Sequence, residues 1–235
     1  MRDWIKAPGF EDHTTRVHWI QVGSLYADIR VPLERPDLSG AGCLAEVPPA
    51  ALLELLRAEG FAGHITLSSD QCTWHRRINW HGQTDELDVG ALSFDPEGRL
   101  IEEGVHATYT ELWSRGPEPS GRAFRYSGDG YEAYLVICGN VFVLGIGRRD
   151  KPATATCLNT LKDGRVPETL AGAFDGVHAY GVWSNGEAIA TLATQPFSEG
   201  QLVARQSASG LDWECIGFDG RNSTRPLTLV NAWAL

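Results

Sequence analysis

Short segments of alternating apolar and polar residues recur along this chain of 235 residues, separated by glycine, proline and aspartate. In the clearest of them, residues 25–31, the odd positions are apolar and the even positions are Tyr, Asp and Arg. Because successive side chains of a strand point to opposite faces, this spacing predicts a strand with one apolar and one polar face. Similar segments predict strands at 16–22, 63–68, 71–80, 87–94, 99–104, 105–113, 131–138, 140–147, 177–183, 187–194, 201–206, 211–218 and 226–234.

One segment of the first half is typical of a helix. Residues 48–60 begin with two prolines, contain several leucines and end at a glycine. A doubly wound sheet would need a helix between most successive strands, and this pattern is absent. Closed barrels leave no strand edge unpaired. We therefore expect an all-β fold of two consecutive small antiparallel barrels with one short helix in the first half; one large β-sandwich is the alternative.

A stretch rich in glycine, proline and serine divides the chain near its middle. It runs from Ser114 to Gly130 and is interrupted only by a short segment at 123–126. Such composition is typical of turns and linkers. We predict an N-terminal barrel over residues 1–115, a linker over 116–130 and a C-terminal barrel over 131–235.

The charge balance argues against two classes of partner. The chain has 20 basic and 30 acidic residues, for a formal net charge of -10. Its densest basic runs, at 75–77 and 148–151, are too short to attract a phosphate backbone or an anionic membrane surface against that charge. We expect neither a nucleic acid nor a membrane as a partner.

The cysteines and the first residues indicate a cytoplasmic protein. The five cysteines are widely spaced and form no CxxC pair, which predicts free thiols in a reducing compartment. Residues 1–8 lack the apolar core of a signal peptide, and no stretch approaches the length of a membrane-spanning segment. We expect the protein to be cytoplasmic.

Several short segments, taken together and in order, carry a resemblance to a known family. They are Tyr26–Pro32, Gly60–Gly63, Ile101–Gly104, Tyr109–Trp113, Tyr131–Gly139 and Gly210–Glu214. In this collinear pattern the chain resembles an uncharacterised fungal family named for an interaction with a casein-kinase-I homologue. The resemblance implies the fold, two lipocalin-like barrels, but no reaction or catalytic residue; a protein partner is one hypothesis that it suggests. The sequence departs from the family around residues 70–90 and 150–180.

Aromatic and titratable residues are concentrated in the predicted strand at 71–81. Alternation places Trp74, Arg76 and Trp80 on one face. If that face lines a barrel interior, the indoles could stack on a planar ligand while Arg76 binds a carboxylate. In the alternative interpretation the tryptophans are core residues, and Arg76 is buried beside a carboxylate such as Asp28, Asp88 or Glu102.

The sequence contains no recognisable metal or cofactor motif. His75 and His81 lie too far apart on one strand to share an ion, and no HExxH, HxH or Cys/His cluster occurs. A single histidine could bind haem in a barrel, but no motif selects one. We predict no metal site and no cofactor.

A second group of titratable residues, on the adjoining strands at 99–113, could transfer protons. It contains Glu102, Glu103, His106, Tyr109 and Glu111. Alternation places Tyr109 and Glu111 on one face and His106 on the other, so the five should not all converge. The alternative is cross-strand pairing on a solvated face.

Three functional hypotheses follow. The first is a lipocalin-like protein that binds a small, partly apolar molecule in a cavity of a few hundred cubic ångströms. This molecule could be an anion. Its expected ligand-binding residues are Asp28, Arg30, Trp74, Arg76, Trp80 and Tyr109. The second is a barrel enzyme that uses Asp28, Glu102, His106 or Tyr109 for acid–base chemistry on a small organic acid. The third is a scaffold that binds another protein.

Overall fold

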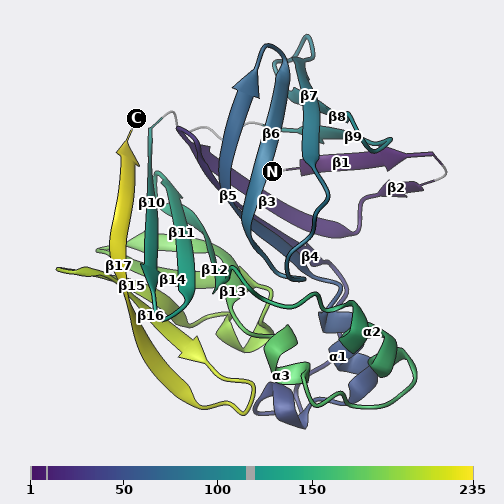
Figure 1. Ribbon diagram of the computed structural model, residues 1–235, viewed down its shortest axis with the longest axis vertical. Helices are drawn as coiled ribbons and strands as arrows, with labels where there is room; N and C mark the ends of the chain where they lie inside the picture. The colour runs from purple at the N-terminus through teal and green to yellow at the C-terminus, as the bar shows by residue number, and fades with distance from the viewer. Residues whose placement is uncertain (1, 9, 115–119, 235) are drawn as a thin grey trace.

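Antiparallel strands make up most of the protein in a computed structural model that describes residues 2–8, 10–114 and 120–234. Strands account for 54% of the residues and helices for 11%, which confirms the predicted all-β class. The strands form two units that follow one another along the chain, with a group of helices at one end of the molecule (Figure 1).

The first unit is a nine-stranded sheet in the order β2-β1-β9-β8-β7-β6-β5-β4-β3. Its strands are β1 Arg2–Ala7, β2 Phe10–Asp12, β3 Thr15–Val22, β4 Leu25–Pro32, β5 Glu59–Ser68, β6 Gln71–Asn79, β7 Asp88–Phe94, β8 Leu100–Gly104 and β9 Thr110–Trp113. The sheet curls so strongly that the rings of Trp19 on β3 and Trp113 on β9 lie 5.3 Å apart. Within the described residues no ladder joins β2 to β3, so this unit is a curled sheet and not the expected closed barrel.

The second unit is a closed barrel of eight strands in sequence order. Its strands are β10 Gly121–Gly128, β11 Tyr131–Cys138, β12 Val141–Arg148, β13 Val177–Ser184, β14 Glu187–Ala193, β15 Leu202–Ser207, β16 Gly210–Ile216 and β17 Asn222–Ala234. Strand β10 closes the barrel by pairing with both β11 and β17. Inward-facing side chains such as Leu135, Phe142 and Trp213 fill its interior as one apolar core.

Strand β10 lies inside the segment that was predicted to be a linker. At the end of this segment, Asp129 and Gly130 form a two-residue hairpin turn between β10 and β11. Asp129 and Gly130 have φ values of 49° and 78°, which the tight turn requires. The predicted linker over 116–130 therefore extends too far, and residues 115–119 lie outside the described part of the chain.

The two units share an apolar core, to which β4 contributes one of its faces. Its odd residues Ala27, Ile29 and Val31 are completely buried and pack with residues of the second barrel such as Val136 and Val143. The even residues of β4 consequently point to the concave side of the first sheet. The predicted alternation in 25–31 is correct, and the apolar face of the strand joins the units.

A group of helices covers one end of both units (Figure 1). It contains α1 Pro49–Leu55, α2 Ala155–Lys162 and α3 Leu170–Ala173, with the 3-10 turn η1 Leu44–Glu46; a second 3-10 turn, η2 Pro196–Ser198, follows β14. Their leucines pack around Trp80 and Phe174. The predicted helix at 48–60 is confirmed in its first part, but Gly60 belongs to β5 and does not end the helix. The close packing of His178 requires a glycine at this position, because a Cβ there would lie 2.2 Å from Cγ of His178.

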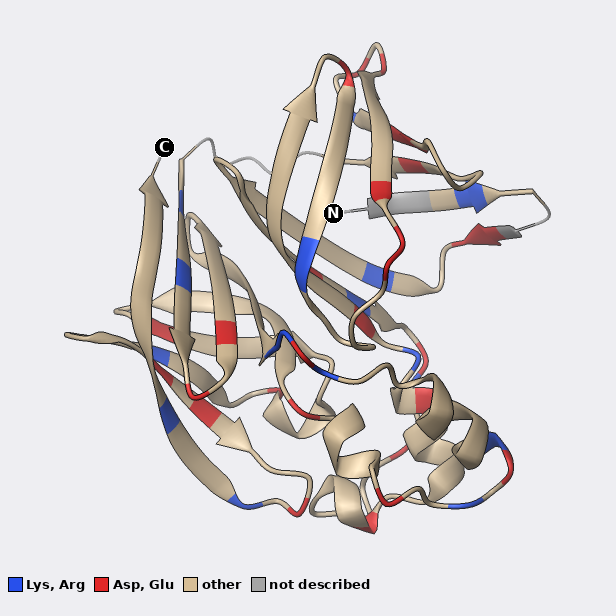
Figure 2. Cartoon of the chain, viewed as in Figure 1, with Lys and Arg blue, Asp and Glu red and all other residues tan. Residues whose placement is uncertain are grey.

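Charged residues of both signs are interspersed over the two units (Figure 2). No helix in the described part of the chain is both long and apolar enough to cross a membrane.

Candidate functional site

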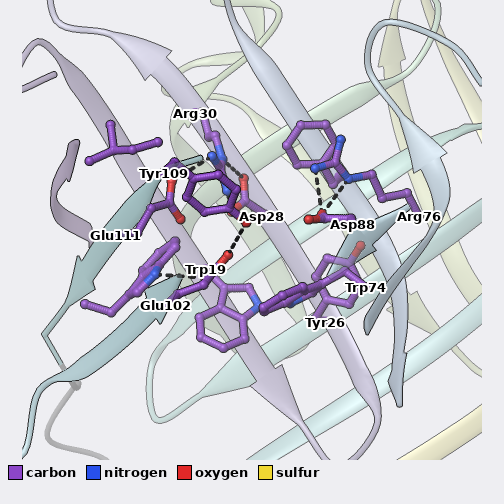
Figure 3. Close-up of a pocket in the computed structure, with 13 residues that line it drawn as sticks. Trp19, Tyr26, Asp28, Arg30, Trp74, Arg76, Asp88, Glu102, Tyr109 and Glu111 are labelled. Atoms are coloured by element: carbon purple, nitrogen blue, oxygen red, sulfur yellow. Dashed lines mark hydrogen bonds and ion pairs between the residues drawn. The ribbon is translucent and has the colours of Figure 1, made fainter. Parts of the chain in front are cut away.

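A partly open cavity of about 130 Å³ lies on the concave side of the curled sheet (Figure 3). Every strand of the sheet except β2 contributes to its lining. The residues that line it are Ile5, Trp19, Tyr26, Asp28, Arg30, Phe61, Trp74, Arg76, Asp88, Glu102, Tyr109, Glu111 and Trp113. The cavity therefore combines six aromatic rings with six charged side chains.

The polar face of β4 supplies one side of the cavity. Arg30 donates from Nε to Oδ1 of Asp28 at 3.1 Å and from Nη1 to Oε1 of Glu111 on β9 at 3.2 Å. Asp28 and Glu111 are 3% and 1% exposed, so the guanidinium lies between two buried carboxylates. Buried charges are tolerated when they are paired in this way, and Arg30 is therefore fully engaged within the protein.

A second arginine is held in the same manner at another side of the cavity. Arg76 on β6 donates from Nε and Nη2 to Oδ2 of Asp88 on β7, at 2.9 and 2.6 Å. Its guanidinium also lies 3.8 Å from the centre of the Phe61 ring. The alternative interpretation from the sequence, in which Arg76 pairs with a nearby carboxylate, is the arrangement observed.

The carboxyl group of Glu102 on β8 receives two hydrogen bonds. The hydroxyl of Tyr109 donates to Oε1 at 2.9 Å, and the indole Nε1 of Trp113 donates to Oε2 at 3.2 Å. Glu102 is 5% exposed and has no arginine of its own. Its surroundings therefore stabilise a negative charge less well than those of Asp28 or Glu111.

These surroundings shift the pKa values of the carboxyl groups. Burial, and the nearby charge of Glu111, raise the pKa of Glu102 to about 8. Burial also raises the pKa of Asp28, although the adjacent Arg30 opposes this effect. Glu102 consequently holds a proton at neutral pH, whereas the other three carboxyl groups of the cavity are paired with arginines.

The charges that line the cavity do not balance. Four carboxyl groups, those of Asp28, Asp88, Glu102 and Glu111, face two guanidinium groups, and the lining contains no lysine or histidine. Without Glu102, three carboxyl groups that form ion pairs still share two guanidinium groups. The cavity is therefore net negative, and becomes more so when Glu102 ionises.

The indole Nε1 of Trp19 and the hydroxyl of Tyr26 are buried polar groups of the cavity wall that have no hydrogen-bond partner among the described residues. The hydroxyl of Tyr26 makes no hydrogen bond to any described residue, although this side chain is only 2% exposed. Burial raises the pKa of Tyr26 well above its ordinary value, so the group is a neutral hydroxyl that can donate or accept. Because nearly all buried polar groups in folded proteins are hydrogen-bonded, this hydroxyl indicates a site for a ligand or a water.

Three indole rings form an aromatic wall. Trp19 packs edge to face against Trp113, with ring centres 5.3 Å apart, and against Trp74, at 6.4 Å. The three come from β3, β9 and β6, so they meet only because the sheet curls. Their contacts fix the rings in place around the cavity.

The structure brings together most of the residues that the sequence nominated for ligand binding. Asp28, Arg30, Trp74, Arg76 and Tyr109 all line the cavity.

Trp80 does not line the cavity. It is 1% exposed and lies among the helices, with its ring 6.0 Å from that of Phe174.

A β-bulge explains the different position of Trp80. In the pairing of β5 with β6, Ala62 faces Ile78 while Gly63 faces Arg76, so that Arg77 is an extra residue. Alternation is therefore shifted by one position beyond Arg77, and residues 78 and 80 point away from the cavity. Gly63 is needed at the bulge, because a Cβ there would lie 2.0 Å from the carbonyl oxygen of His75.

The proton-transfer group predicted on the adjoining strands is only partly assembled. Glu102, Tyr109 and Glu111 line the cavity, as does Asp28 from β4. Glu103 and His106 are exposed, and neither belongs to the cavity lining. Three of the four residues of the enzyme hypothesis thus share one cavity. The fourth, His106, lies outside it.

Sequence reasoning did not assign Trp19, Tyr26, Phe61 or Trp113 to the site. Tyr26 could have been found, because it shares the polar face of the predicted strand with Asp28 and Arg30. Trp19 and Trp113 are far apart along the chain, and only the curl of the sheet brings them together. No local pattern in the sequence reports that curl.

The cavity is smaller than the few hundred cubic ångströms that were expected. It also lies below the roughly 300–1,000 Å³ typical of sites for drug-sized ligands. A water molecule occupies about 30 Å³ in the liquid, so the cavity has room for about four waters. Within the described part of the chain, no group of three or more His, Cys, Asp or Glu residues is arranged to hold a metal ion.

Comparisons with known proteins do not assign the chain to a family. No protein-family model matches it, and no curated protein matches its sequence. A crystal structure of an uncharacterized protein from Saccharomyces cerevisiae is similar over 97% of this chain and 83% of the other, with 7% identity and a TM-score of 0.45. A similarity at this level carries no information about function.

Proposed function

We propose that the first unit is a binding protein for a small molecule, which it holds in the cavity of the curled sheet. The observation that carries the proposal is the unpartnered hydroxyl of Tyr26 in the wall of this cavity. Most buried polar groups in folded proteins are hydrogen-bonded, and this unpartnered hydroxyl faces a cavity where a bound molecule has room to supply the missing bond. A ligand that hydrogen-bonds to the Tyr26 hydroxyl supplies the partner that the described residues do not provide.

The size of the cavity limits the ligand. A cavity of about 150 Å³ with apolar walls is large enough to hold benzene. At about 130 Å³, this cavity accommodates a molecule, or one end of a molecule, of roughly six non-hydrogen atoms. The interior of the barrel in the second unit is filled by apolar side chains, which supports a structural role for that unit.

Acid–base catalysis is a second candidate function, which one observation favours. Glu102 holds a proton up to a pH of about 8, as a general acid at neutral pH must, and it lies in the same cavity as Asp28. Proton NMR of mixtures of the protein with small organic acids tests this candidate. New product signals that disappear in Glu102→Gln would support it, and unchanged spectra over a day would argue for binding alone.

Fluorine NMR of protein labelled with 5-fluorotryptophan tests the binding proposal. Three tryptophans line the cavity, whereas Trp80, Trp183 and Trp213 are buried elsewhere and serve as internal controls. Each signal is assigned by a single Trp→Phe substitution. A library of compounds with four to eight non-hydrogen atoms is then added.

Saturable shifts of the signals of Trp19, Trp74 and Trp113, with the control signals unchanged, are expected for at least one class of compound. Shifts confined to the controls, or no saturable shift with any compound, would overturn the proposal. Tyr26→Phe should weaken binding without changing the fold, because it removes only the unpartnered hydroxyl.

We also infer that the protein works in a reducing compartment such as the cytoplasm. The five cysteines, all within the described residues, form no disulfide. Burial raises the pKa of Cys72 to about 12, so this thiol stays protonated and unreactive. Alkylation under denaturing conditions, without reductant, should modify five thiols in protein isolated from its native cell, and fewer would contradict the inference.

A further inference from the structure

We infer that the ligand of this cavity is a small organic cation of the alkylammonium class, held between buried carboxylates and indole rings. The inference rests on the proposed function above and names its ligand class. Four features of the cavity support it.

The first feature is that both arginines are already engaged. Arg30 is bonded to Asp28 and Glu111, and Arg76 is bonded to Asp88. An anionic ligand would have to displace one of these carboxylates, leaving a buried charge without its partner. The cavity offers no third cationic side chain to receive an anion.

The second feature is the excess of negative charge. Three carboxyl groups, those of Asp28, Glu111 and Asp88, are paired with only two guanidinium groups, and Glu102 is a fourth carboxyl group in the same cavity. Inside a protein, an uncompensated charge is much more costly than in water. A ligand with one positive charge neutralises this excess. The bound cation also favours the ionised form of Glu102.

The third feature is the aromatic wall. Cations are attracted to the faces of Trp, Tyr and Phe rings, most strongly to Trp, and this attraction is the general basis of quaternary-ammonium recognition. The cavity is lined by Trp19, Trp74 and Trp113. The position of Arg76 above the ring of Phe61 shows that the site already stabilises one cation on an aromatic face.

The fourth feature is the hydroxyl of Tyr26. It is almost fully buried and has no partner among the described residues. This hydroxyl can accept a hydrogen bond from a primary ammonium or donate one to a hydroxyl elsewhere on the ligand. It therefore adds a neutral polar contact to the charged and aromatic ones.

The arrangement does not suit a hard metal ion. Calcium takes six to eight oxygen ligands, and magnesium requires octahedral oxygen coordination. Here both oxygens of Asp28, Oε1 of Glu111 and Oδ2 of Asp88 accept bonds from arginines, and Glu102 receives hydrogen bonds from Tyr109 and Trp113. A quaternary ammonium needs no such coordination shell, because its charge is spread over carbon-bound hydrogens, and a primary ammonium needs only hydrogen-bond acceptors.

Ionisation of Glu102 should be coupled to binding. Glu102 faces the carboxylates of Glu111 and Asp88, the guanidinium of Arg30, the hydroxyl of Tyr109 and the indole N–H of Trp113; the protonated thiol of Cys72 is also nearby. A bound cation favours the charged form of this carboxyl, so binding at neutral pH should release a proton. The affinity for a permanently charged cation should therefore rise with pH.

Size-matched probes distinguish charge from shape. Choline and 3,3-dimethylbutan-1-ol have the same skeleton, except that a quaternary nitrogen in the first is a carbon in the second; 3,3-dimethylbutanoate adds a negative charge. Tetramethylammonium and tert-butanol form a smaller pair. Binding of each probe is measured from the fluorotryptophan signals between pH 6 and pH 9.

The cation of each pair should bind at least tenfold more tightly than its neutral partner at pH 8, and the carboxylate should not bind. Equal or tighter binding of the neutral or anionic member would overturn the cation inference while leaving the proposed function intact. Failure of every probe and of the wider compound library would instead refute the proposed function. The two failures are thus distinguishable.

A matched pair of variants tests the part played by Glu102. Glu102→Gln should lower the affinity for choline at pH 8 about tenfold, abolish its rise with pH and leave the affinity for 3,3-dimethylbutan-1-ol unchanged. Glu103→Gln makes the same change of charge at the exposed neighbouring residue of β8 and should behave as the unmodified protein. Equal losses in both variants would show that overall charge, not the cavity, governs cation affinity, and would overturn the inference.

Discussion

Replacing Glu102 with glutamine should change how the stability of the protein depends on pH. The Glu102 carboxyl has an ordinary pKa of 4.5, and burial beside Glu111 raises it to about 8 in the folded protein. Between these values the folded protein holds a proton that the unfolded chain has lost. Because the folded state then binds more protons, its free energy of unfolding falls as pH rises through this window.

The size of the effect follows from the shift. One pKa unit corresponds to about 1.4 kcal/mol, so Glu102 should lower the stability by roughly 3 kcal/mol between pH 5 and pH 8. Glutamine resembles the protonated acid and lacks this loss. However, its amide nitrogen cannot accept one of the two hydrogen bonds from Tyr109 and Trp113, at a cost of about 1 kcal/mol.

Urea denaturation, followed by circular dichroism at pH 5, 6, 7 and 8, measures this difference. Glu102→Gln should be about as stable as the unmodified protein near pH 5, or slightly less stable, and clearly more stable at pH 8. Glu103→Gln, which alters an exposed side chain, should follow the unmodified protein throughout. A stability difference between Glu102→Gln and the unmodified protein that stays constant across this range would show that Glu102 has an ordinary pKa, and would refute the argument.

Three further substitutions test other parts of the structure. Gly63→Ala should lower the free energy of unfolding by more than about 2 kcal/mol in urea, because its Cβ would lie 2.0 Å from the carbonyl oxygen of His75; a change under about 0.5 kcal/mol would contradict the bulge. Tyr26→Phe should leave the urea midpoint unchanged or raise it, because the hydroxyl has no described partner, and a loss above about 1 kcal/mol would show that it has one. Ile29→Ala should destabilise both units together by about 2–5 kcal/mol, giving one calorimetric transition at a lower temperature; two separate transitions would argue against a shared core.

Much of the fold could be predicted because strand alternation is a local property. The pattern in residues 25–31 correctly separates the residues that pack between the units from those that line the cavity. Most other strands were also found within a few residues of their ends. The short strands β1 and β2, the strand β10 and the helices α2 and α3 were not found, because their patterns are brief or interrupted by glycine, proline or polar residues.

Features that depend on several distant segments could not be predicted. The bulge at Arg77 reverses the direction of later side chains, so Trp80 was placed in the site although it packs among the helices. A glycine-containing turn at Asp129 and Gly130 was taken for part of a linker, because turns and linkers share the same residues. The net charge of the cavity depends on which residues from eight strands converge, and this too is set by the curl of the sheet.

A crystal structure of the protein grown with choline at pH 8 tests the central claim most directly. We predict density for the trimethylammonium group in the cavity, within about 6 Å of the indole centres of Trp19, Trp74 or Trp113 and beside the carboxyl group of Glu102. Density for choline only outside the curled sheet, or a cavity closed by its own side chains, would contradict the claim that this fold binds a small cation.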